Sequence, residues 1–362
     1  MKAPDALARL IARQMSQSRG WMGFDRFMAL ALYAPGAGYY SGPLRKLGRM
    51  PESGSDFVTA PELSVWFGRT LARSVQEALH TTRTQEVFEF GAGTGALALQ
   101  LLNALGETVT RYHIVDLSGA LRQRQQETLA GHGQRVVWHD EWPERMSGVV
   151  VGNELLDAMP VQLLSRQNGT WHERGVVAND DPQRPWAWSD RPTDLRPPLE
   201  IEGSHDYLCE IHPQAEAFVR TLAQRLQRGA VFLIDYGFPE REYYHPQRHM
   251  GTLMCHQGHR SDTDPLADVG AKDITAHVNF TGIALAAQEA GLEVLGYTSQ
   301  ARFLINSGLV EMLEGASLAE RAMAQKLLTE HEMGELFKVI ALGAQSSWEP
   351  LGFVEGDRTH TL

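Results

Sequence analysis

Apolar residues near the N-terminus recur with helical spacing. Residues 3–18 carry them on one face, which predicts a helix, and Asp25 is expected to cap a second helix that ends near Leu32. The following stretch, Gly36 to Pro61, is dense in Gly, Pro and Ser. It predicts a long ordered loop, and loops of that length often carry function. The chain is therefore expected to begin with two helices and a loop that pack against a larger body.

From Glu62 onward, apolar runs of strand length alternate with helical patterns. The predicted strands cover Glu86 to Phe90, Tyr112 to Asp116, Arg135 to Trp138, Gly148 to Gly152, Ala230 to Asp235, Leu292 to Tyr297 and Phe337 to Leu342. The predicted helices cover Glu62 to Leu79, Ser118 to Ala130, Ala96 to Leu105, Gln214 to Gln227 and Thr281 to Ala290. This alternation predicts an α/β fold with a doubly wound, mostly parallel sheet and helices on both faces.

Breaks in the pattern divide the chain. Residues 178–199 hold five prolines among Asp and Arg, which predicts an exposed excursion from the core, and the last residues are expected to form a loosely held tail. The predicted organisation is N-terminal helices and a loop over 1–61, a core over 62–345 with insertions near 162–212 and 238–278, and a tail over 346–362.

A glycine turn carries the first chemical signal. The segment EFGAGTG at 89–95 stands where the first core strand ends and a helix begins. Glycines let the backbone turn sharply and approach a ligand closely, and the start of a helix presents unpaired N–H groups. Glu89 can accept a hydrogen bond from a ligand ammonium, and Asp116, at the end of the next strand, can hold ribose hydroxyls. This set favours a methyl donor of the S-adenosylmethionine type.

A dinucleotide is the rival ligand for the same turn. Gly91, Gly93 and Ala96 match the G-x-G-x-x-G/A fingerprint, and Asp116 follows about 20 residues further on, as that fingerprint requires. The methyl donor is favoured by the acid before the turn, by a third glycine within it and by the lack of a second recognisable nicotinamide-binding half. A purely structural turn is the third interpretation.

A second polar cluster follows the apolar run Val149 to Gly152. It contains Asn153, Glu154 and Asp157, which should lie at the carboxyl edge of the sheet, where open α/β folds bind ligands. Asn153 and Glu154 can face the donor and the acceptor. The structural alternative is that Glu154 or Asp157 caps a helix or pairs with a surface Arg.

Other candidates also have two interpretations. Asp235 ends an inner strand and can face the ligand or cap the next loop, while His277 can act as a general base or make a structural hydrogen bond. Tyr39, Tyr40 and Phe57 can form a wall over the donor or fill the interface of the N-terminal helices.

Composition narrows the choice of partners. The 362 residues include 33 basic and 44 acidic side chains, a formal charge of −11, which argues against binding to nucleic acid and suits a cationic partner. No apolar run approaches the roughly 20 residues that span a bilayer. The first residues lack the features of a secretory signal, and the two cysteines, Cys209 and Cys255, provide no disulfide framework. A cytoplasmic location is expected, without membrane insertion.

Histidines raise the question of a metal. Cys255, His256 and His259 lie close together, with His245 and His249 upstream. Their spacing matches no standard zinc pattern, so a structural or substrate-loop role is favoured and no metal is expected.

Several motifs in one order resemble the MidA-like family, which includes the mitochondrial complex I assembly arginine methyltransferase and its bacterial relatives. The resemblance covers most of the chain. It rests on GYYS at 38–41, DFVTAPELS at 56–64, EFGAGTG at 89–95, NELLDAMP at 153–160, IDYG at 234–237, GTL at 251–253, His259, DPL at 264–266 and DITAHVNF at 273–280. Asp116 stands where much of the family has Glu, and Asn279 where Asp is more usual.

The resemblance implies a Rossmann-like class I methyltransferase that uses S-adenosyl-L-methionine and methylates a protein arginine, with a role in respiratory complex assembly for the mitochondrial members. The loop before Pro61 is expected to cover the donor. Asn153, Glu154 and Asp157 are assigned to catalysis at the acceptor. The donor site is assigned to Glu89, Gly91, Gly93, Gly95, Asp116, Leu117, Ser118, Thr59 and Pro61. A small-molecule methyltransferase and a non-catalytic assembly factor that binds the donor are the alternatives.

Overall fold

The protein, seen in a computed structural model that describes residues 3–42, 58–116 and 119–362, is built around an eight-stranded sheet. Its order is β15-β16-β10-β5-β2-β3-β4, with β14 beside β10. The strands from β4 to β10 are parallel, and β16 runs antiparallel between β10 and β15. The bounds are β2 (Glu86–Phe90), β3 (Arg111–Val115), β4 (Val136–His139), β5 (Met146–Asn153), β10 (Leu226–Phe238), β14 (Val278–Asn279), β15 (Glu293–Ser299) and β16 (Phe337–Ala344). The predicted doubly wound α/β sheet is confirmed.

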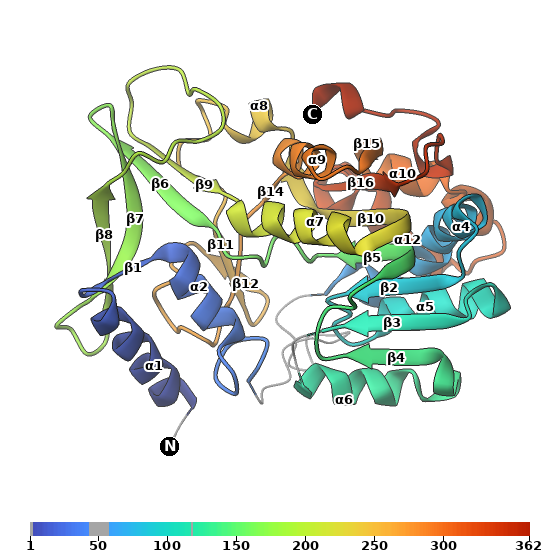
Figure 1. Ribbon diagram of the computed structural model, residues 1–362, viewed down its shortest axis with the longest axis horizontal. Coiled ribbons are helices and arrows are strands. Elements are labelled where there is room, and N and C mark those ends of the chain that lie inside the picture. Colours follow the sequence, from blue (N-terminus) through green and yellow to red (C-terminus); the bar gives the residue numbers. More distant parts are fainter. Residues whose placement is uncertain (1–2, 43–57, 117–118) are drawn as a thin grey trace.

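Helices cover both faces of this sheet (Figure 1). One face packs against α4 (Val65–Thr82), α5 (Ala96–Leu105) and α10 (Gln300–Asn306), and the other against α7 (Pro213–Arg225) and α9 (Phe280–Glu289). Strands in the middle of the sheet are buried from both sides, which explains their nearly continuous apolar sequences.

One predicted helix is divided in two. The helix expected over 62–79 is α3 (Ala60–Leu63) followed by α4, because Ser64 has an extended backbone and its side chain accepts a hydrogen bond from the Trp66 N–H. The other helices are α6 (Gly119–Thr128), α8 (Glu240–Tyr243), α11 (Leu309–Met312) and α12 (Leu318–Leu328). Short 3-10 or π turns cover Gly106–Thr108, Ala130–Arg135, Glu330–Gly334, Leu351–Phe353 and Thr359–Thr361.

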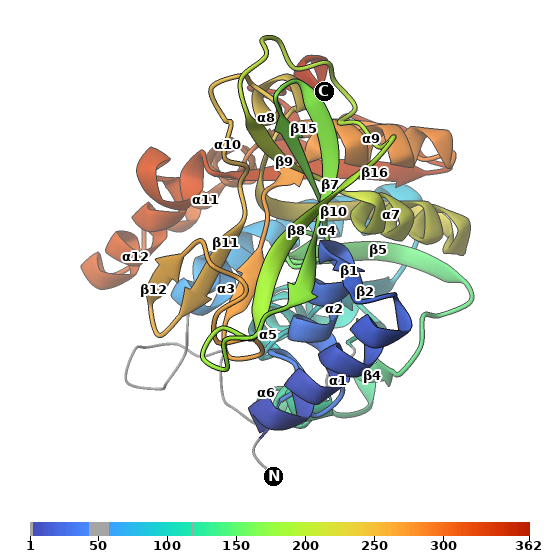
Figure 2. The same ribbon diagram turned by 90° about the vertical axis from the view of Figure 1, so that its left-hand side faces the viewer.

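A second, antiparallel sheet stands beside the first and faces the viewer in Figure 2. It consists of β1 (Trp21–Gly23), β7 (Thr170–Ala178), β6 (Gln162–Gln167), β9 (Tyr207–Ile211) and β8 (Trp186–Pro192), which pairs with β7. Most residues of 178–199 are exposed, as predicted, but the range also contains β8, which pairs with β7 and buries Trp186. A third sheet is formed by β11 (Met254–Gln257), β12 (Arg260–Asp262) and β13 (Asp273–Thr275).

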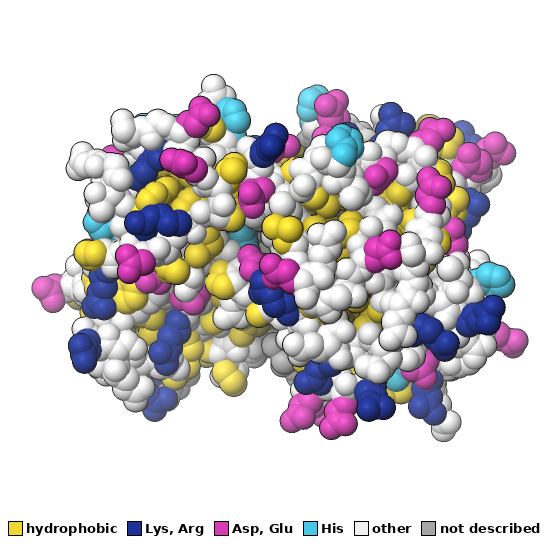
Figure 3. Space-filling view, turned by 45° about the horizontal axis from the view of Figure 1, so that its top comes forward, with side chains coloured by type: hydrophobic (Ala, Val, Ile, Leu, Met, Phe, Trp, Pro, Cys, Tyr) yellow, Lys and Arg dark blue, Asp and Glu magenta, His cyan; other side chains and the backbone are white. Residues whose placement is uncertain are grey.

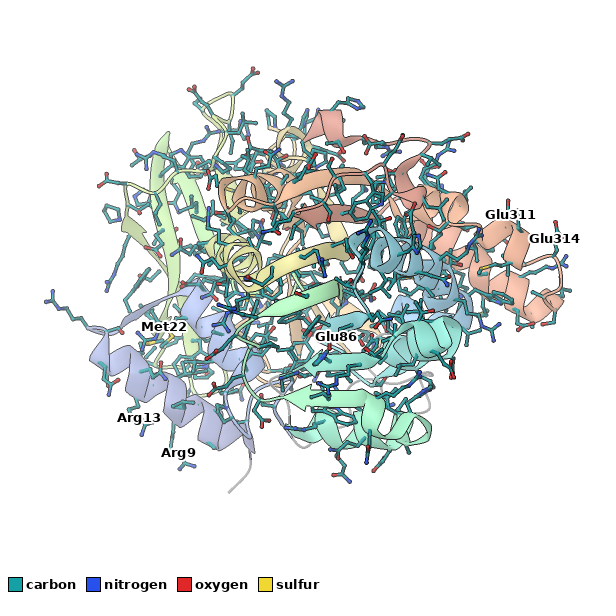
Figure 4. All side chains as sticks on the ribbon, turned by 45° about the vertical axis from the view of Figure 1, so that its right-hand side comes forward. Arg9, Arg13, Met22, Glu86, Glu311 and Glu314 are labelled. Carbon is teal, nitrogen blue, oxygen red and sulfur yellow. The ribbon has the colours of Figure 1, made fainter. Side chains whose placement is uncertain are left out.

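The N-terminal helices share a core with these two smaller sheets. Helices α1 (Ala3–Gln17) and α2 (Phe24–Tyr33) bury an apolar cluster with residues of β6, β7, β11 and β13. Figure 4 shows Arg9 and Arg13 projecting from the outer side of α1, while Met22 is buried. The predicted cap is wrong: the N-cap of α2 is Gly23, and Asp25 lies inside the first turn.

The C-terminal residues are docked on the sheet, so the prediction of a loosely held tail over 346–362 is wrong. Phe353 is buried, and its ring occupies the space that a side chain at Gly296 would need. Asp357 accepts a hydrogen bond from the Tyr297 N–H at 2.9 Å, and Thr298 Oγ1 donates to the Gly356 carbonyl at 2.7 Å. The sequence signal was weak because the segment has few apolar residues and no periodicity.

Charged side chains of both signs are interspersed over the face shown in Figure 3. The acidic excess is therefore not gathered into one field on that face. Within the three described ranges, no helix is both long and apolar enough to cross a membrane.

Candidate functional site

A cleft lies at the carboxyl ends of the central parallel strands, where the order of strands reverses between β2 and β5. It encloses about 1990 Å³ up to its open mouth. A smaller pocket of about 370 Å³ adjoins it at the glycine turn. The two share the residues Thr59, Gly91, Gly93 and Asn153. The two polar clusters predicted from the sequence thus meet in one place.

The glycine turn requires its glycines. Gly91, Gly93 and Gly95 have φ of +69°, +53° and +81°, a region that other residues enter only with strain. A Cβ at Gly91 would also stand 3.0 Å from a methyl group of Leu155. Gly95 is the N-cap of α5, so the turn leads directly into the unpaired N–H groups of a helix start.

Glu89 lies buried behind the turn and lines the smaller pocket. Its Oε2 accepts a hydrogen bond from the Tyr112 hydroxyl at 2.7 Å. Burial raises the pKa of this carboxyl to about 7, against the lowering effect of the Tyr112 bond. A positively charged ligand group in the pocket would favour the ionised form.

The remaining predicted donor residues line the same region, as far as the structure describes them. Asp116 follows β3 and lines the cleft, while Thr59 lines both cavities. Pro61 lines the smaller pocket, and its carbonyl accepts a hydrogen bond from Gln100 at 2.6 Å. Leu117 and Ser118 lie outside the described residues, as do residues 43–57 of the loop predicted to cover the donor.

Asn153 and Glu154 stand between the two cavities. Glu154 has φ +50°, a strained conformation for a residue with a side chain, and its Oε1 accepts hydrogen bonds from Asn153 Nδ2 at 3.0 Å and the Ala60 N–H at 3.3 Å. Asn153 Oδ1 is buried with no partner within the described residues. An unpaired buried acceptor at a pocket wall is a place for a ligand donor group.

A turn, not a helix, presents the acidic side chains. Asp235 Oδ2 accepts hydrogen bonds from the N–H groups of Leu155, Leu156 and Asp157 at 3.0, 2.7 and 3.3 Å. Asp235 therefore caps this turn, whereas the sequence predicted that it would face the ligand or cap the loop that follows it. The turn directs Glu154 and Asp157 into the cleft, so neither is a helix cap.

The carboxyl groups around this turn raise one another's pKa. Burial, followed by the charge of Asp235, raises the pKa of Glu154 to about 8. Burial, Asp235, Asp273 and Glu154 together hold the pKa of Asp157 well above its usual range. The cleft thus gathers carboxyl groups that burial and mutual repulsion hold toward their protonated forms, and a bound cation would favour their ionised forms.

Tyrosines form the wall opposite the turn. The rings of Tyr33 and Tyr40 are stacked with centroids 5.5 Å apart. The Tyr33 hydroxyl donates to the Ala158 carbonyl at 2.8 Å, and the Tyr40 hydroxyl donates to Asp273 Oδ1 and Oδ2 at 2.9 and 3.0 Å. Tyr236 and His256 complete this end of the cleft. Tyr40 both lines the cleft and packs against the N-terminal core, so the predicted wall over the donor stays a prediction, whereas Tyr39 is buried in that core and Phe57 lies outside the described residues.

Sequence reasoning missed several of these residues. Asp273 belongs to a family-like motif but gave no signal of its place, because it comes from the third sheet. The other end of the cleft contains an aromatic cluster that was also missed: the ring of Phe90 lies 4.6 Å from Trp142 and 5.4 Å from Phe218. Such a cluster offers a flat apolar surface to a ligand ring.

The histidines do not assemble a metal centre in the described part of the chain, where no group of three or more His, Cys, Asp or Glu side chains is arranged to hold an ion. His277 lies between the rings of Tyr236 and Phe238, and burial lowers its pKa to about 4. It does not line the cleft, which speaks against a general base, but its buried Nδ1 has no hydrogen-bond partner within the described residues, so the predicted structural hydrogen bond is not seen at that atom.

Comparison with known proteins agrees with this geometry. A family model described as "Putative S-adenosyl-L-methionine-dependent methyltransferase" matches residues 68–298, more than half of the chain. A curated relative, the mitochondrial protein arginine methyltransferase NDUFAF7 of Danio rerio, is 27% identical over 89% of this chain and 83% of its own length. Its counterpart in Bos taurus is 26% identical over 90% and 81%.

Two solved structures cover nearly the whole chain. A Burkholderia thailandensis protein crystallised with S-adenosyl-homocysteine is 48% identical, with a TM-score of 0.94 over 99% of this chain and 97% of the other. A native crystal structure of a protein from the same bacterium is 47% identical with a TM-score of 0.90 over the same shares. The predicted family, fold class and cofactor class are confirmed. This chain belongs to the family of S-adenosyl-L-methionine-dependent methyltransferases.

Proposed function

We propose that the protein transfers a methyl group from S-adenosyl-L-methionine to an arginine side chain of a protein. The observation that carries the arginine is the cluster of buried carboxyl groups at one end of the cleft. Three other carboxyl groups, those of Asp235, Asp273 and Glu154, lie close enough to Asp157 for their charges to raise its pKa. A guanidinium placed among them would gain charge-assisted hydrogen bonds and relieve their repulsion.

The glycine turn supports donor binding. Gly91, Gly93 and Gly95 form a cradle that a side chain would fill or strain, and the unpartnered Asn153 Oδ1 suits the donor's ammonium group. Asp116 would hold the ribose hydroxyls. The aromatic cluster around Trp142 would then contact the adenine ring. Glu89, Thr59 and Pro61 complete the proposed donor site, with Leu117 and Ser118 proposed from sequence alone.

The acceptor residues would orient a nitrogen and take its proton. Bound S-adenosyl-L-methionine supplies an electrophilic methyl group, and its transfer forms an N–C bond as the S–C bond breaks. Glu154 and Asp157 would align the nitrogen, and one of them would accept the proton that it loses. A carboxyl whose pKa is raised to about 8, as that of Glu154 is, binds this proton more firmly than an ordinary carboxyl. Asn153 would hold Glu154 in place through its 3.0 Å hydrogen bond.

The relatives extend the proposal to a partner. The match to this chain covers 83% of the Danio rerio relative and 81% of the Bos taurus relative, and both are named protein arginine methyltransferases. We propose a protein substrate connected with assembly of a respiratory complex, on the family resemblance. We also propose a reducing, cytoplasmic location, because Cys209 and Cys255 are both buried free thiols.

The domain division predicted from the sequence stays a proposal. Residues 1–61 contain α1, α2 and β1, and the insertions near 162–212 and 238–278 contain the other strands of the second sheet and the whole third sheet. The proposed donor site would draw on the core and on Thr59 and Pro61 of the N-terminal segment, and the proposed acceptor end on the turn after β5 of the core and on these additions.

A labelling experiment tests the function. The purified protein would be incubated with labelled S-adenosyl-L-methionine and lysate of cells that lack it, and the labelled species identified by mass spectrometry. We expect label on arginine of one or a few proteins. Label in the small-molecule fraction would favour the alternative substrate class. Tight binding of S-adenosyl-homocysteine without any labelled product would favour the non-catalytic assembly factor.

A further inference from the structure

A glutamine on α6 holds the donor end of the cleft from behind. Gln125 is 0% exposed, and its Nε2 donates to Asp116 Oδ2 at 2.8 Å and to the Gly93 carbonyl at 3.1 Å. One amide group thus connects the carboxylate proposed to bind ribose with the glycine turn proposed to bind the rest of the donor. The sequence offered no sign of it, because Gln125 lies in a polar helix with no recognisable motif.

The orientation of this amide is fixed by a third partner. Trp138 Nε1 contacts Gln125 Oε1 at 3.2 Å, and an indole N–H can only donate. The amide oxygen must therefore face Trp138, which directs both amide hydrogens toward Asp116 and Gly93, two acceptors. Each hydrogen has one acceptor, so the buried amide is fully used.

The same helix face restrains the turn at further points. Thr128 Oγ1 donates to the Thr94 carbonyl at 2.9 Å, and a Cβ at Gly95 would lie 3.4 Å from Gln125 Cα. Hydrogen bonds from α6 thus hold the carbonyls of the turn at its back. Carbonyls fixed there leave the N–H groups of the turn for the ligand side.

We infer that Gln125 is a positioning residue for the methyl donor: it sets the Asp116 carboxylate and the glycine turn in the relative placement that donor binding requires. The inference rests on the proposed donor site and not on the identity of the acceptor. It differs from a merely structural role, in which loss of a satisfied buried amide would lower stability without changing how the protein discriminates between donor analogues.

Calorimetry with S-adenosyl-homocysteine gives the first test. Gln125→Met keeps the volume and removes all three hydrogen bonds, and we expect affinity to fall about tenfold, as for loss of one bond to a charged group. Gln300→Met is the matched control. Gln300 lies in α10, is also 0% exposed, and donates a hydrogen bond to the carbonyl of Leu327 in α12 at 3.1 Å. The control should keep wild-type affinity even if it melts earlier. Trp138→Phe removes the N–H that orients the amide, together with part of the ring, but leaves the Gln125 side chain in place, and it should weaken binding about threefold.

A double-mutant cycle supplies the readout that a structural role would not move. If Gln125 acts through Asp116, Gln125→Met should weaken binding much less in an Asp116→Ala background than in the wild type. It should also reduce the preference for S-adenosyl-homocysteine over its 2′-deoxy analogue. In the labelling assay the apparent KM for the donor should rise about tenfold while the rate at saturating donor stays within twofold.

The outcomes separate this inference from the proposed function. Wild-type protein that binds no S-adenosyl-homocysteine would refute the donor site itself. Wild-type binding with unchanged affinity in folded Gln125→Met and Trp138→Phe, or strictly additive effects with Asp116→Ala, would refute the positioning role alone. If Gln125→Met fails to fold, Trp138→Phe decides between the two results.

Discussion

The two ends of the cleft are built in different ways. The donor end comes mostly from one continuous strand–turn–helix–strand unit between Glu86 and Asp116. The acceptor end combines Tyr33 and Tyr40 from the N-terminal segment, the turn after β5, and Asp273 from the third sheet. A ligand shared by a whole family can be bound by local sequence. The residues proposed to contact the acceptor come only in part from the central sheet, in the turn after β5, and otherwise from segments outside it.

The ends also differ in their electrostatics. At the donor end, burial is the first cause of the raised pKa of Glu89, the hydroxyl of Tyr112 lowers that pKa, and a single carboxylate, Asp116, adds to the rise as the last of the causes. At the acceptor end, Glu154 and Asp157 are raised by burial and also by neighbouring carboxylates. The first arrangement suits a modest interaction with an ammonium. The second stores repulsion that only a cation or a proton removes.

The largest expected effect is on the rate of methyl transfer, which substitutions at the acceptor end should lower without changing donor affinity. Glu154→Gln and Asp157→Asn should each lower methyl transfer about a hundredfold or more, the usual contribution of a positioned acid–base group. Donor affinity should stay within a few-fold, because one neutral hydrogen bond contributes about 1 kcal/mol. The measurements are the labelling rate at saturating donor and calorimetry with S-adenosyl-homocysteine.

The comparison breaks if the assignment is reversed. Should either variant lose donor binding while saturating donor restores full turnover, that residue belongs to the donor end. Glu154 has a positive φ, which strains any residue with a side chain. Glu154→Gln keeps a side chain of the same size there, so it changes the charge without changing this backbone strain.

The next effect concerns the donor end alone. Asp116→Ala should remove the carboxylate proposed to accept hydrogen bonds from the ribose, worth about 1.5 to 3 kcal/mol, and so weaken donor binding about ten- to a hundredfold. The rate at saturating donor should change little. Calorimetry measures the affinity, and detectable NADH binding with none of S-adenosyl-homocysteine would contradict the ligand assignment.

The donor end could be predicted because its determinants are close in sequence. The positive φ at Gly91, Gly93 and Gly95 is predictable because glycine is the residue that adopts it readily. Asp116 lies beside the turn because β3, which it follows, pairs in parallel with β2, which the turn follows. The direction of the Glu154 turn could not be predicted, since it depends on Asp235, some eighty residues later, capping three backbone N–H groups.

Most of the acceptor end could not be predicted from the sequence, because it depends on pairing between segments that are far apart in the chain. The second sheet pairs β1 with β7 across more than 150 residues, and no local pattern records such a register. Asp273 lines the cleft beside Tyr40, whose hydroxyl donates to it although the two residues are 233 positions apart in the sequence. The docked C-terminal segment was missed for the same reason: its anchors are Tyr297 and Thr298, not its own periodicity.

A smaller effect is expected from the tyrosine wall. Tyr40→Phe removes the hydroxyl that donates to both oxygens of Asp273 and should raise the apparent KM for the protein acceptor about three- to tenfold, with donor affinity unchanged. Tyr297→Phe is the control, because the buried Tyr297 hydroxyl has no hydrogen-bond partner in the described parts of the chain. Equal effects of the two substitutions would show that Tyr40 acts on general stability and not on the acceptor end.

The smallest effect concerns the pH dependence of stability, and it tests the raised pKa of Glu154, which burial and the charge of Asp235 cause. The pKa of Glu154 is raised from 4.5 to about 8 in the folded protein, so the native state binds a proton more firmly than the unfolded chain between those values. The free energy of unfolding should therefore fall as pH rises from about 4.5 to about 8, and Asp235, whose pKa is raised to about 7, contributes with the same sign. Glu154→Gln cannot ionise, so its melting temperature should rise relative to that of the wild type between pH 5 and pH 8, by roughly 1 °C for each 1 kcal/mol that ionisation of Glu154 costs the wild type in this chain of 362 residues. Parallel melting curves across this range would show that the acceptor end stores no such repulsion, and the contrast between the two ends would then rest on geometry alone.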